Sequence, residues 1–213
     1  MDPVAVVAFV AAGGFAVGDW VSRARNDRRL EYLCKPATLL ALVVVAASLH
    51  PASGAGARRG WFVAALVFSL AGDVLLMLPR EQFVAGLSAF LVAHVCFVAG
   101  FWTHGPGLVA FVAALAAVAV VIGSLGARIL PAVRDRDRAL VIPVAAYMAV
   151  IGAMVATAVA VGNPLAAAGA VLFAASDSMI AWDRFVGEFA GAGVLIMVTY
   201  HLGQAGLIAS LLR

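Results

Sequence analysis

One stretch of the chain places an acidic residue inside a segment that is otherwise apolar enough to cross a bilayer. Residues 167–185 read AAGAVLFAASDSMIAWDRF, with Asp177 between Ser176 and Ser178. A carboxylate in hydrocarbon is energetically costly, so such a residue indicates a functional site by default. The alternative is that Asp177 only joins two helices through a hydrogen bond.

A second segment repeats this arrangement and favours the functional reading. Residues 68–78, FSLAGDVLLML, carry Asp73 with Ser69 one helical turn before it. Two intramembrane aspartates, each beside small and hydroxyl residues, are therefore the candidate catalytic pair.

The composition indicates a polytopic membrane protein. Of the 213 residues, 65% are hydrophobic and 12% charged, whereas a soluble domain is about half apolar and a quarter charged. Apolar stretches close to bilayer length recur along the chain. We therefore expect an all-α membrane protein, a bundle of eight transmembrane helices in a single domain over residues 1–213. The expected spans are Pro3–Val21, Leu33–His50, Trp61–Leu78, Phe83–Thr103, Gly107–Leu130, Ala139–Val161, Pro164–Trp182 and Phe189–Leu212.

The basic residues cluster on one side of this arrangement. The side opposite the cluster has only Arg58, Arg59 and Arg213. The positive-inside rule then makes the loops after the odd-numbered spans cytoplasmic and places both termini outside. The clustering informs topology and does not indicate nucleic-acid binding. The Ala-, Arg- and Val-rich composition suggests a GC-rich bacterial genome, so we expect the bacterial inner membrane. The clustered residues are Arg23, Arg25, Arg28, Arg29, Arg80, Arg134, Arg136, Arg138 and Arg184, with Lys35 and Arg128 adjoining.

The span ends and a weak repeat add two further expectations. All four tryptophans fall at span ends, as interfacial residues do. The chain also divides into two four-helix halves, with Asp73 and Asp177 each on the third helix of its half, and such halves would run parallel. Coincidence in so Ala- and Val-rich a chain is the favoured reading of this repeat. The tryptophans are Trp20, Trp61, Trp102 and Trp182.

Several polar residues lie at related depths. Asp73 and Asp177 are roughly 9 Å from the cytoplasmic ends of their helices, and Lys35, with Pro36 in a first helical turn, is at the same level. We therefore expect a pocket that opens toward the cytoplasm. Lys35 could instead snorkel to the interface. Other intramembrane polar residues lie deeper in the spans: His94, Tyr147, Tyr200, His201 and Gln204.

An aromatic stripe with one imidazole follows the fourth span at a three-to-four spacing. Ordinary packing or lipid contact is the favoured reading of its phenylalanines. His94 has two open readings, a role in the site and a satisfied helix–helix hydrogen bond. The stripe consists of Phe83, Gly86, Phe90, His94, Phe97 and Phe101.

This ordered set of residues resembles the lysoplasmalogenase (YhhN-like) family of multi-pass membrane proteins over nearly the whole chain. The resemblance implies hydrolysis of the vinyl-ether bond of lysoplasmalogens, which releases a fatty aldehyde and glycerophosphoethanolamine or glycerophosphocholine. The residues that carry it are Lys35-Pro36, Ser69 to Asp73, Phe83, Gly86, Phe90, His94, Tyr147, Gly169, Phe173, Ser176 to Ser178, Tyr200 and Gln204.

The chemistry of this reaction fits the two acids. Vinyl-ether hydrolysis protonates an alkene carbon and passes through an oxocarbenium ion, much as glycosidases do. We expect Asp177, in the tighter small-residue setting, to be the acid, and Asp73 to stabilise the cation or orient water; the exchanged roles remain open. We expect membrane lipids around the protein, a lysophospholipid substrate that enters from lipid, and no metal or cofactor. The expected substrate-binding residues are Lys35, Ser69, His94, Tyr147, Ser176, Ser178, Tyr200 and Gln204, with Lys35, Arg80 or Arg184 at the lipid phosphate.

Three alternatives remain open. The first is a proton-coupled transporter of lipids or small molecules that uses the same aspartates as a relay. The second is a metal-dependent lipid hydrolase with Asp73, Asp177, His94 and His201 as ligands, although paired-histidine spacing is lacking. The third is a lipid-binding scaffold without catalysis. Cys34 and Cys96 have spacings that predict neither a disulfide nor a zinc site.

Overall fold

The computed structural model describes residues 2–49, 56–79 and 82–212. Within these residues it has eight helices long and apolar enough to cross a membrane. The predicted all-α bundle is therefore confirmed, and the chain is a multi-pass membrane protein. The helices are α1 (Pro3–Arg25), α2 (Arg28–Ser48), α3 (Gly56–Met77), α4 (Phe83–Trp102), α5 (Leu108–Arg136), α6 (Val141–Ala160), α7 (Pro164–Ala181) and α8 (Ala192–Ala209), with short helical turns η1 (Arg138–Leu140), η2 (Trp182–Val186) and η3 (Ser210–Leu212).

The start of α2 corrects one predicted boundary. The Asp27 side chain accepts hydrogen bonds from the Arg29 and Leu30 backbone N–H groups, which is the N-cap arrangement that begins a helix. The helix therefore begins at Arg28, before the predicted Leu33, and Pro36 lies inside it. The expectation that Pro36 occupies a first turn was wrong. The predicted end of this span at His50 lies outside the described residues.

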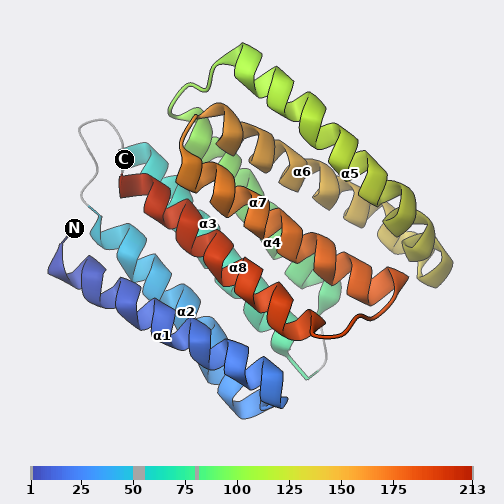
Figure 1. The fold of residues 1–213 in the computed structure, drawn as a ribbon, viewed down its shortest axis with the longest axis horizontal. Coiled ribbons are helices and arrows are strands. Elements are labelled where there is room, and N and C mark those ends of the chain that lie inside the picture. Colours follow the sequence, from blue (N-terminus) through green and yellow to red (C-terminus); the bar gives the residue numbers. More distant parts are fainter. Residues whose placement is uncertain (1, 50–55, 80–81, 213) are drawn as a thin grey trace.

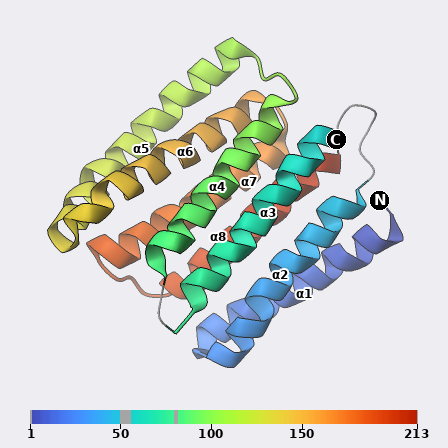
Figure 2. The ribbon, with the colours of Figure 1, turned by 180° about the vertical axis from the view of Figure 1, so that it is seen from behind.

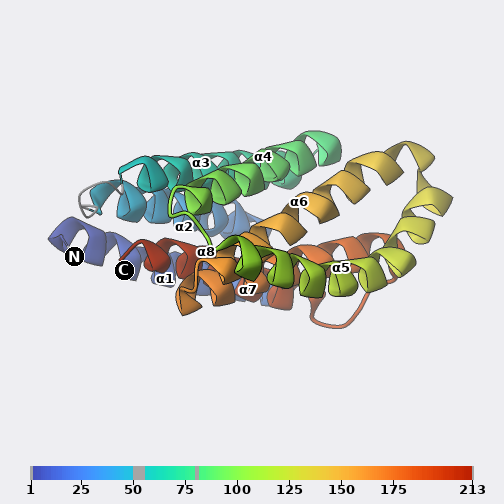
Figure 3. The same cartoon turned by 90° about the horizontal axis from the view of Figure 1, so that it is seen from above.

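The helices pair as four consecutive hairpins that are joined by cross-contacts. Each helix packs mainly against its neighbour in the chain, while α2 also contacts α3, α4 contacts α6, and α1 contacts α8. The α1–α2 pair lies at one edge of the bundle and the α5–α6 pair at the other (Figures 1 and 2). Viewed from above, α3 and α4 form one layer and α7 and α8 the other (Figure 3). The central helices thus come from both halves of the chain.

Helices α7 and α8 approach each other through glycines. A Cβ on Gly169 would lie 2.6 Å from the Leu207 nitrogen and 2.8 Å from the Gly203 carbonyl oxygen. Only a residue without a side chain permits that separation. Helices α7 and α8 are therefore closely packed at this point, which fixes α7 relative to α8.

Arg58 joins three helices at the end of the bundle where α3 begins and α4 and α8 end. Its guanidinium lies over the Phe62 and Phe101 rings, at 5.3 and 5.7 Å from their centroids. It donates to Ser210 Oγ at 3.2 Å and to His104 Nε2 at 3.4 Å. Burial and the nearby Arg58 cation lower the pKa of His104, so His104 accepts as the neutral imidazole. Arg58 therefore links α3 to the ends of α4 and α8.

Candidate active site

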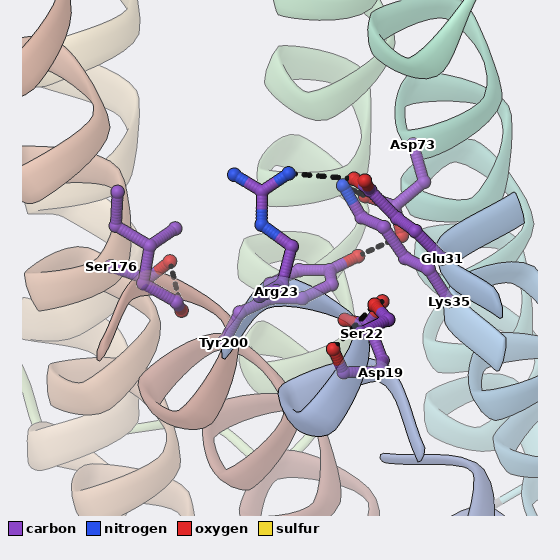
Figure 4. A network of polar contacts seen from close by, with 9 residues as sticks. Asp19, Ser22, Arg23, Glu31, Lys35, Asp73, Ser176 and Tyr200 are labelled. Atoms are coloured by element: carbon purple, nitrogen blue, oxygen red, sulfur yellow. Dashed lines mark hydrogen bonds and ion pairs between the residues drawn. The ribbon is translucent and has the colours of Figure 1, made fainter. Parts of the chain in front are cut away.

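Asp73 is the centre of a buried polar cluster formed by three helices. Lys35 Nζ of α2 lies 3.1 Å from Asp73 Oδ1, and the Tyr200 hydroxyl of α8 donates to Oδ2 at 2.7 Å (Figure 4). The Asp73 side chain is 1% exposed and the Lys35 side chain 8% exposed. Lys35 therefore points inward as the partner of a carboxylate and does not snorkel to the surface.

The polar network extends toward the ends of α1 and α2. Arg23 Nη1 lies 2.9 Å from Glu31 Oε1, and buried Asp19 accepts a hydrogen bond from Ser22 at 3.3 Å (Figure 4). Sequence reasoning did not assign Glu31 to this region. Its position four residues before Lys35, and so on the same helical face, is the signal that could have found it.

Asp177 is the centre of a second cluster, again from three helices. The Tyr147 hydroxyl of α6 donates a hydrogen bond to Asp177 Oδ2, and His94 Nε2 of α4 lies 3.6 Å from the same oxygen. The Asp177 side chain is 11% exposed. No lysine or arginine among the described residues lies within ion-pair distance of it, which distinguishes its surroundings from those of Asp73.

The backbone fixes which nitrogen of His94 carries its hydrogen. Nδ1 lies 2.6 Å from the Phe90 carbonyl oxygen, and an oxygen of that kind can only accept. Neutral His94 therefore carries its hydrogen on Nδ1 and presents a bare Nε2 on the side of Asp177. Within the described residues Nε2 has no hydrogen-bond donor, so it is free to accept a proton.

An aromatic wall stands between the two clusters. The Phe173 ring packs against Tyr200 at 5.3 Å and against His94 at 4.7 Å between centroids. The Phe90 ring packs edge-on against both Phe173 and Tyr200. Ring contacts through Phe173 thus connect Tyr200, the partner of Asp73, to His94, the neighbour of Asp177.

Asp177 lines a small apolar cavity that Asp73 does not reach. The cavity has a volume of about 70 Å³, and its walls come from α3 to α7 and η2. That volume is enough for a few water molecules or a small group of a larger ligand. The lining includes Leu76, Phe83, Leu87, Phe90, Tyr147, Met148, Asp177, Ser178 and Phe185.

The aromatic stripe of α4 divides between packing and this cavity. Phe97 and Phe101 both pack edge-on against Phe62, with centroids 5.1 Å apart, as the packing reading expects. Phe83 and Phe90 line the cavity. The stripe is therefore part core and part site.

The predicted serines and glutamine differ in their surroundings. Buried Ser176 donates to the Ile196 carbonyl of α8 at 3.0 Å, so it joins two helices. Ser178 donates to the Ala174 carbonyl of its own helix at 2.7 Å, although it lines the cavity. In the described part of the chain, the buried Ser69 hydroxyl and both ends of the Gln204 amide have no hydrogen-bond partner. Ser69 and Gln204 each lie one turn from a residue of the Asp73 cluster, so that cluster has polar groups available to water or a ligand.

Basic residues near the cavity are positioned differently from one another. The Arg184 guanidinium lies over the Phe83 ring at 4.0 Å from its centroid, beside Phe185, and both rings line the cavity. Lys35 is held by Asp73. The prediction for Arg80 lies outside the described residues. Arg184 is thus the described basic residue next to the Asp177 cavity.

His201 does not join the aspartates. Its Nδ1 accepts from Trp20 Nε1 at 3.1 Å, between α8 and α1, so Trp20 has a partner within the bundle in addition to its place near a span end. Over residues 2–49, 56–79 and 82–212, no three His, Cys, Asp or Glu side chains converge as metal ligands would. Cys34 and Cys96 are free and buried.

Comparisons with known proteins match most of the chain to one protein family. The model of the YhhN family matches residues 30–211. A lysoplasmalogenase of Mycobacterium bovis is 31% identical, over 95% of this chain and 89% of its own length. Lysoplasmalogenase TMEM86B of Homo sapiens is 32% identical, over 88% of this chain and 79% of its own length. The Mus musculus protein of that name is 34% identical, over 84% and 74%. No solved structure matches the chain.

Proposed function

Because the chain belongs to the YhhN family, we propose that it is a membrane-embedded hydrolase that cleaves the vinyl-ether bond of lysoplasmalogens to a fatty aldehyde and a glycerophospho-headgroup. The observation that carries this proposal is Asp177, a carboxyl group at a largely apolar cavity that has no lysine or arginine within ion-pair distance among the described residues. The name lysoplasmalogenase of its relatives supports the same reaction.

Asp177 acts as the general acid. The Lys35 ammonium stabilises Asp73 as a carboxylate, whereas in the part of the chain that the structure describes no lysine or arginine lies within ion-pair distance of Asp177. In the first step the O–H bond of Asp177 breaks and a C–H bond forms at the outer alkene carbon. The positive charge is then shared between the inner carbon and the ether oxygen. The Tyr147 hydroxyl, which donates to Asp177 Oδ2, stabilises the carboxylate as it forms.

Water completes the reaction. It adds to the cationic carbon and gives its proton to the Asp177 carboxylate, directly or through the bare Nε2 of His94, which lies 3.6 Å from Oδ2. The product is a hemiacetal. Its carbon–oxygen bond to glycerol and the O–H bond of its hydroxyl then break, the hydroxyl proton passes to the glycerol oxygen, and the aldehyde remains. The acid thus returns to its starting form, as general acid–base catalysis requires.

The Asp73 cluster binds water and the glycerol part of the substrate. Asp73 is the fixed carboxylate that orients water, held by Lys35 and Tyr200. Ser69 and Gln204 have polar groups without a hydrogen-bond partner among the described residues, and these groups suit water or a glycerol hydroxyl. Arg184, at the cavity wall, is suited to the lipid phosphate. By the positive-inside rule this end of the bundle faces the cytoplasm.

The test compares three single-chain phospholipids that differ only at the bond to the chain: vinyl ether, saturated ether and ester. Purified protein in liposomes should release aldehyde from the vinyl ether and leave the other two intact. Cleavage of the ester with an inert vinyl ether would show that the proposed reaction class is wrong. Uptake of the lipid without any product would favour the transporter alternative.

A further inference from the structure

A second apolar space lies beside α7, on the flank of the bundle formed by α5. It has a volume of about 520 Å³ and is lined along one face of α5, one face of α7 and one residue of α6. Helix α5 is held to the bundle by α6 and by η2 and lies at the edge of the bundle (Figure 1). The lining residues on α5, from Ala117 to Leu125, belong to its middle section. The lining residues are Ala117, Val118, Val121, Ile122, Leu125, Val155, Val171, Ala174, Ala175 and Ser178.

This groove is adjacent to the cavity at Asp177. Ile122 and Ser178 line both spaces. The Ser178 hydroxyl is bonded within its own helix, so it adds no free donor to either space. Further along α5, Ile129 packs with Phe185 in a separate apolar cluster, and both residues line the cavity. The groove and the cavity thus lie side by side, between the flank formed by α5 and the acid on α7.

The dimensions fit one hydrocarbon chain of one leaflet. From Ala117 to Ile129 the lining covers about 18 Å along α5 at the rise of an α-helix. One leaflet contributes about 15 Å of hydrocarbon, half the thickness of the bilayer core. The small side chains of Ala117 on one wall and of Ala174 and Ala175 on the other leave the groove wide enough for a hydrocarbon chain. The acid lies at the end of α7 nearer the basic loops, where the polar part of a lipid would be.

We propose that this groove, defined by the lining residues above, is the binding site for the hydrocarbon chain of a single-chain phospholipid, which enters sideways from the membrane. The bond next to the headgroup then lies at Asp177 and the phosphate toward Arg184. This rests on the proposed function for the identity of the bond but not for the occupancy of the groove. A second copy of this protein and an ordinary two-chain lipid are the competing occupants.

A labelling experiment tests the occupant without any turnover. The probe is a single-chain phospholipid with a saturated ether bond and a photoreactive diazirine near the end of its chain, added to the protein in liposomes. We expect label in residues 117–125 and 171–178, competed by an unlabelled single-chain phospholipid and not by a two-chain one. Label elsewhere, equal competition by two-chain lipid, or protein–protein crosslinks at these segments would overturn the proposal.

A matched pair of variants tests the role of the groove in catalysis. Val121 lines the groove and is 58% exposed, whereas its neighbour Val120 is 73% exposed and does not line it. Val121→Trp should lower kcat/KM for a long-chain substrate relative to a short-chain one by about tenfold, as expected when two or so buried methylenes are displaced. Val120→Trp should leave that ratio unchanged.

The outcomes separate this inference from the proposed function. Suppose that the wild type cleaves vinyl ethers and that the ratio of kcat/KM for long-chain and short-chain substrates is the same in both tryptophan variants. That result would overturn the groove proposal and leave the proposed function standing. A wild-type protein that is inert on vinyl ethers but labels in the groove would overturn the function alone.

Discussion

The Tyr200 hydroxyl lies 2.7 Å from Asp73 Oδ2, although 127 residues separate them. Tyr200 is on the last helix of the chain and Asp73 on the third. The converse contact joins His94, on the fourth helix, to Asp177, on the seventh. Each acid is thus held by the second helix of its own half, through Lys35 or Tyr147, and by the fourth helix of the other half. This exchange supports the parallel four-plus-four repeat that we propose from the sequence, and it means that neither cluster can form from one half alone.

Replacing Tyr147 with Phe should slow the chemical step. The variant loses the donor to Asp177 Oδ2, which stabilises the carboxylate as the proton leaves, and removing such a donor lowers kcat by about a hundredfold. Steady-state kinetics on a vinyl-ether lysophospholipid measures this. Tyr32→Phe is the matched control, because Tyr32 is exposed on α2, and it should behave as wild type. Equal kcat in the wild type and Tyr147→Phe would contradict the assignment.

Replacing Lys35 with Met should destabilise the fold. The change leaves Asp73 buried without its cationic partner, and breaking a buried pair in this way costs about 3–5 kcal/mol. Denaturant unfolding in detergent micelles measures the loss. The double variant Lys35→Met/Asp73→Leu should regain much of that stability, because both charges are gone, while remaining inactive. A single variant as stable as wild type would show that the ion pair is not a feature of the folded state.

His94 and His201 should respond differently to replacement by Phe. His94 Nε2 faces Asp177, so His94→Phe should lower kcat by about a hundredfold with little change in KM. His201 binds Trp20 away from the acids, so His201→Phe should keep kcat and lose about 1 kcal/mol of stability. A loss of kcat in both variants, together with inhibition by chelators, would instead favour the metal-dependent alternative.

Gly169→Ala should loosen the α7–α8 contact. The new methyl group would meet the Leu207 backbone nitrogen at 2.6 Å, and overpacking of this kind costs about 1–3 kcal/mol. Gly14→Ala is the control, since no atom lies within 4 Å of its Cβ position and Ala is the better helix former. Thermal unfolding in detergent should rank Gly169→Ala below wild type and Gly14→Ala at or above it. The reverse order would contradict the observed close approach of α7 and α8.

The sequence was sufficient for the number of helices, because hydropathy over bilayer-length stretches determines it. The sequence could not give the rotation of each helix about its own axis, because an apolar helix in lipid has no polar face that would orient it. For Lys35, a place in the pocket and snorkelling to the interface therefore both remained open, whereas the structure shows that it faces Asp73. The groove beside α5 was missed for a related reason: α5 is apolar all round, so lipid contact and a binding groove have the same sequence pattern.

The boundary of α2 shows a different failure. The hydropathy pattern predicts the start of a span at its first apolar residues. The helix itself starts earlier, directly after its N-cap residue Asp27. The added turns place Pro36 and Lys35 inside the helix. Recognition of that cap would also have brought Glu31 onto the same face as Lys35, and with it the contact with Arg23.

The most direct test of the account follows aldehyde release by the wild type and by Asp177→Asn, in ordinary water and in deuterium oxide, from one vinyl-ether lysophospholipid in liposomes. If Asp177 delivers a proton to the alkene carbon, the wild type should be slower in deuterium oxide. Its rapidly trapped aldehyde should carry one deuterium next to the carbonyl carbon, and folded Asp177→Asn should release almost none. Aldehyde release by Asp177→Asn at the wild-type rate, or from the wild type without deuterium at that carbon, would contradict it.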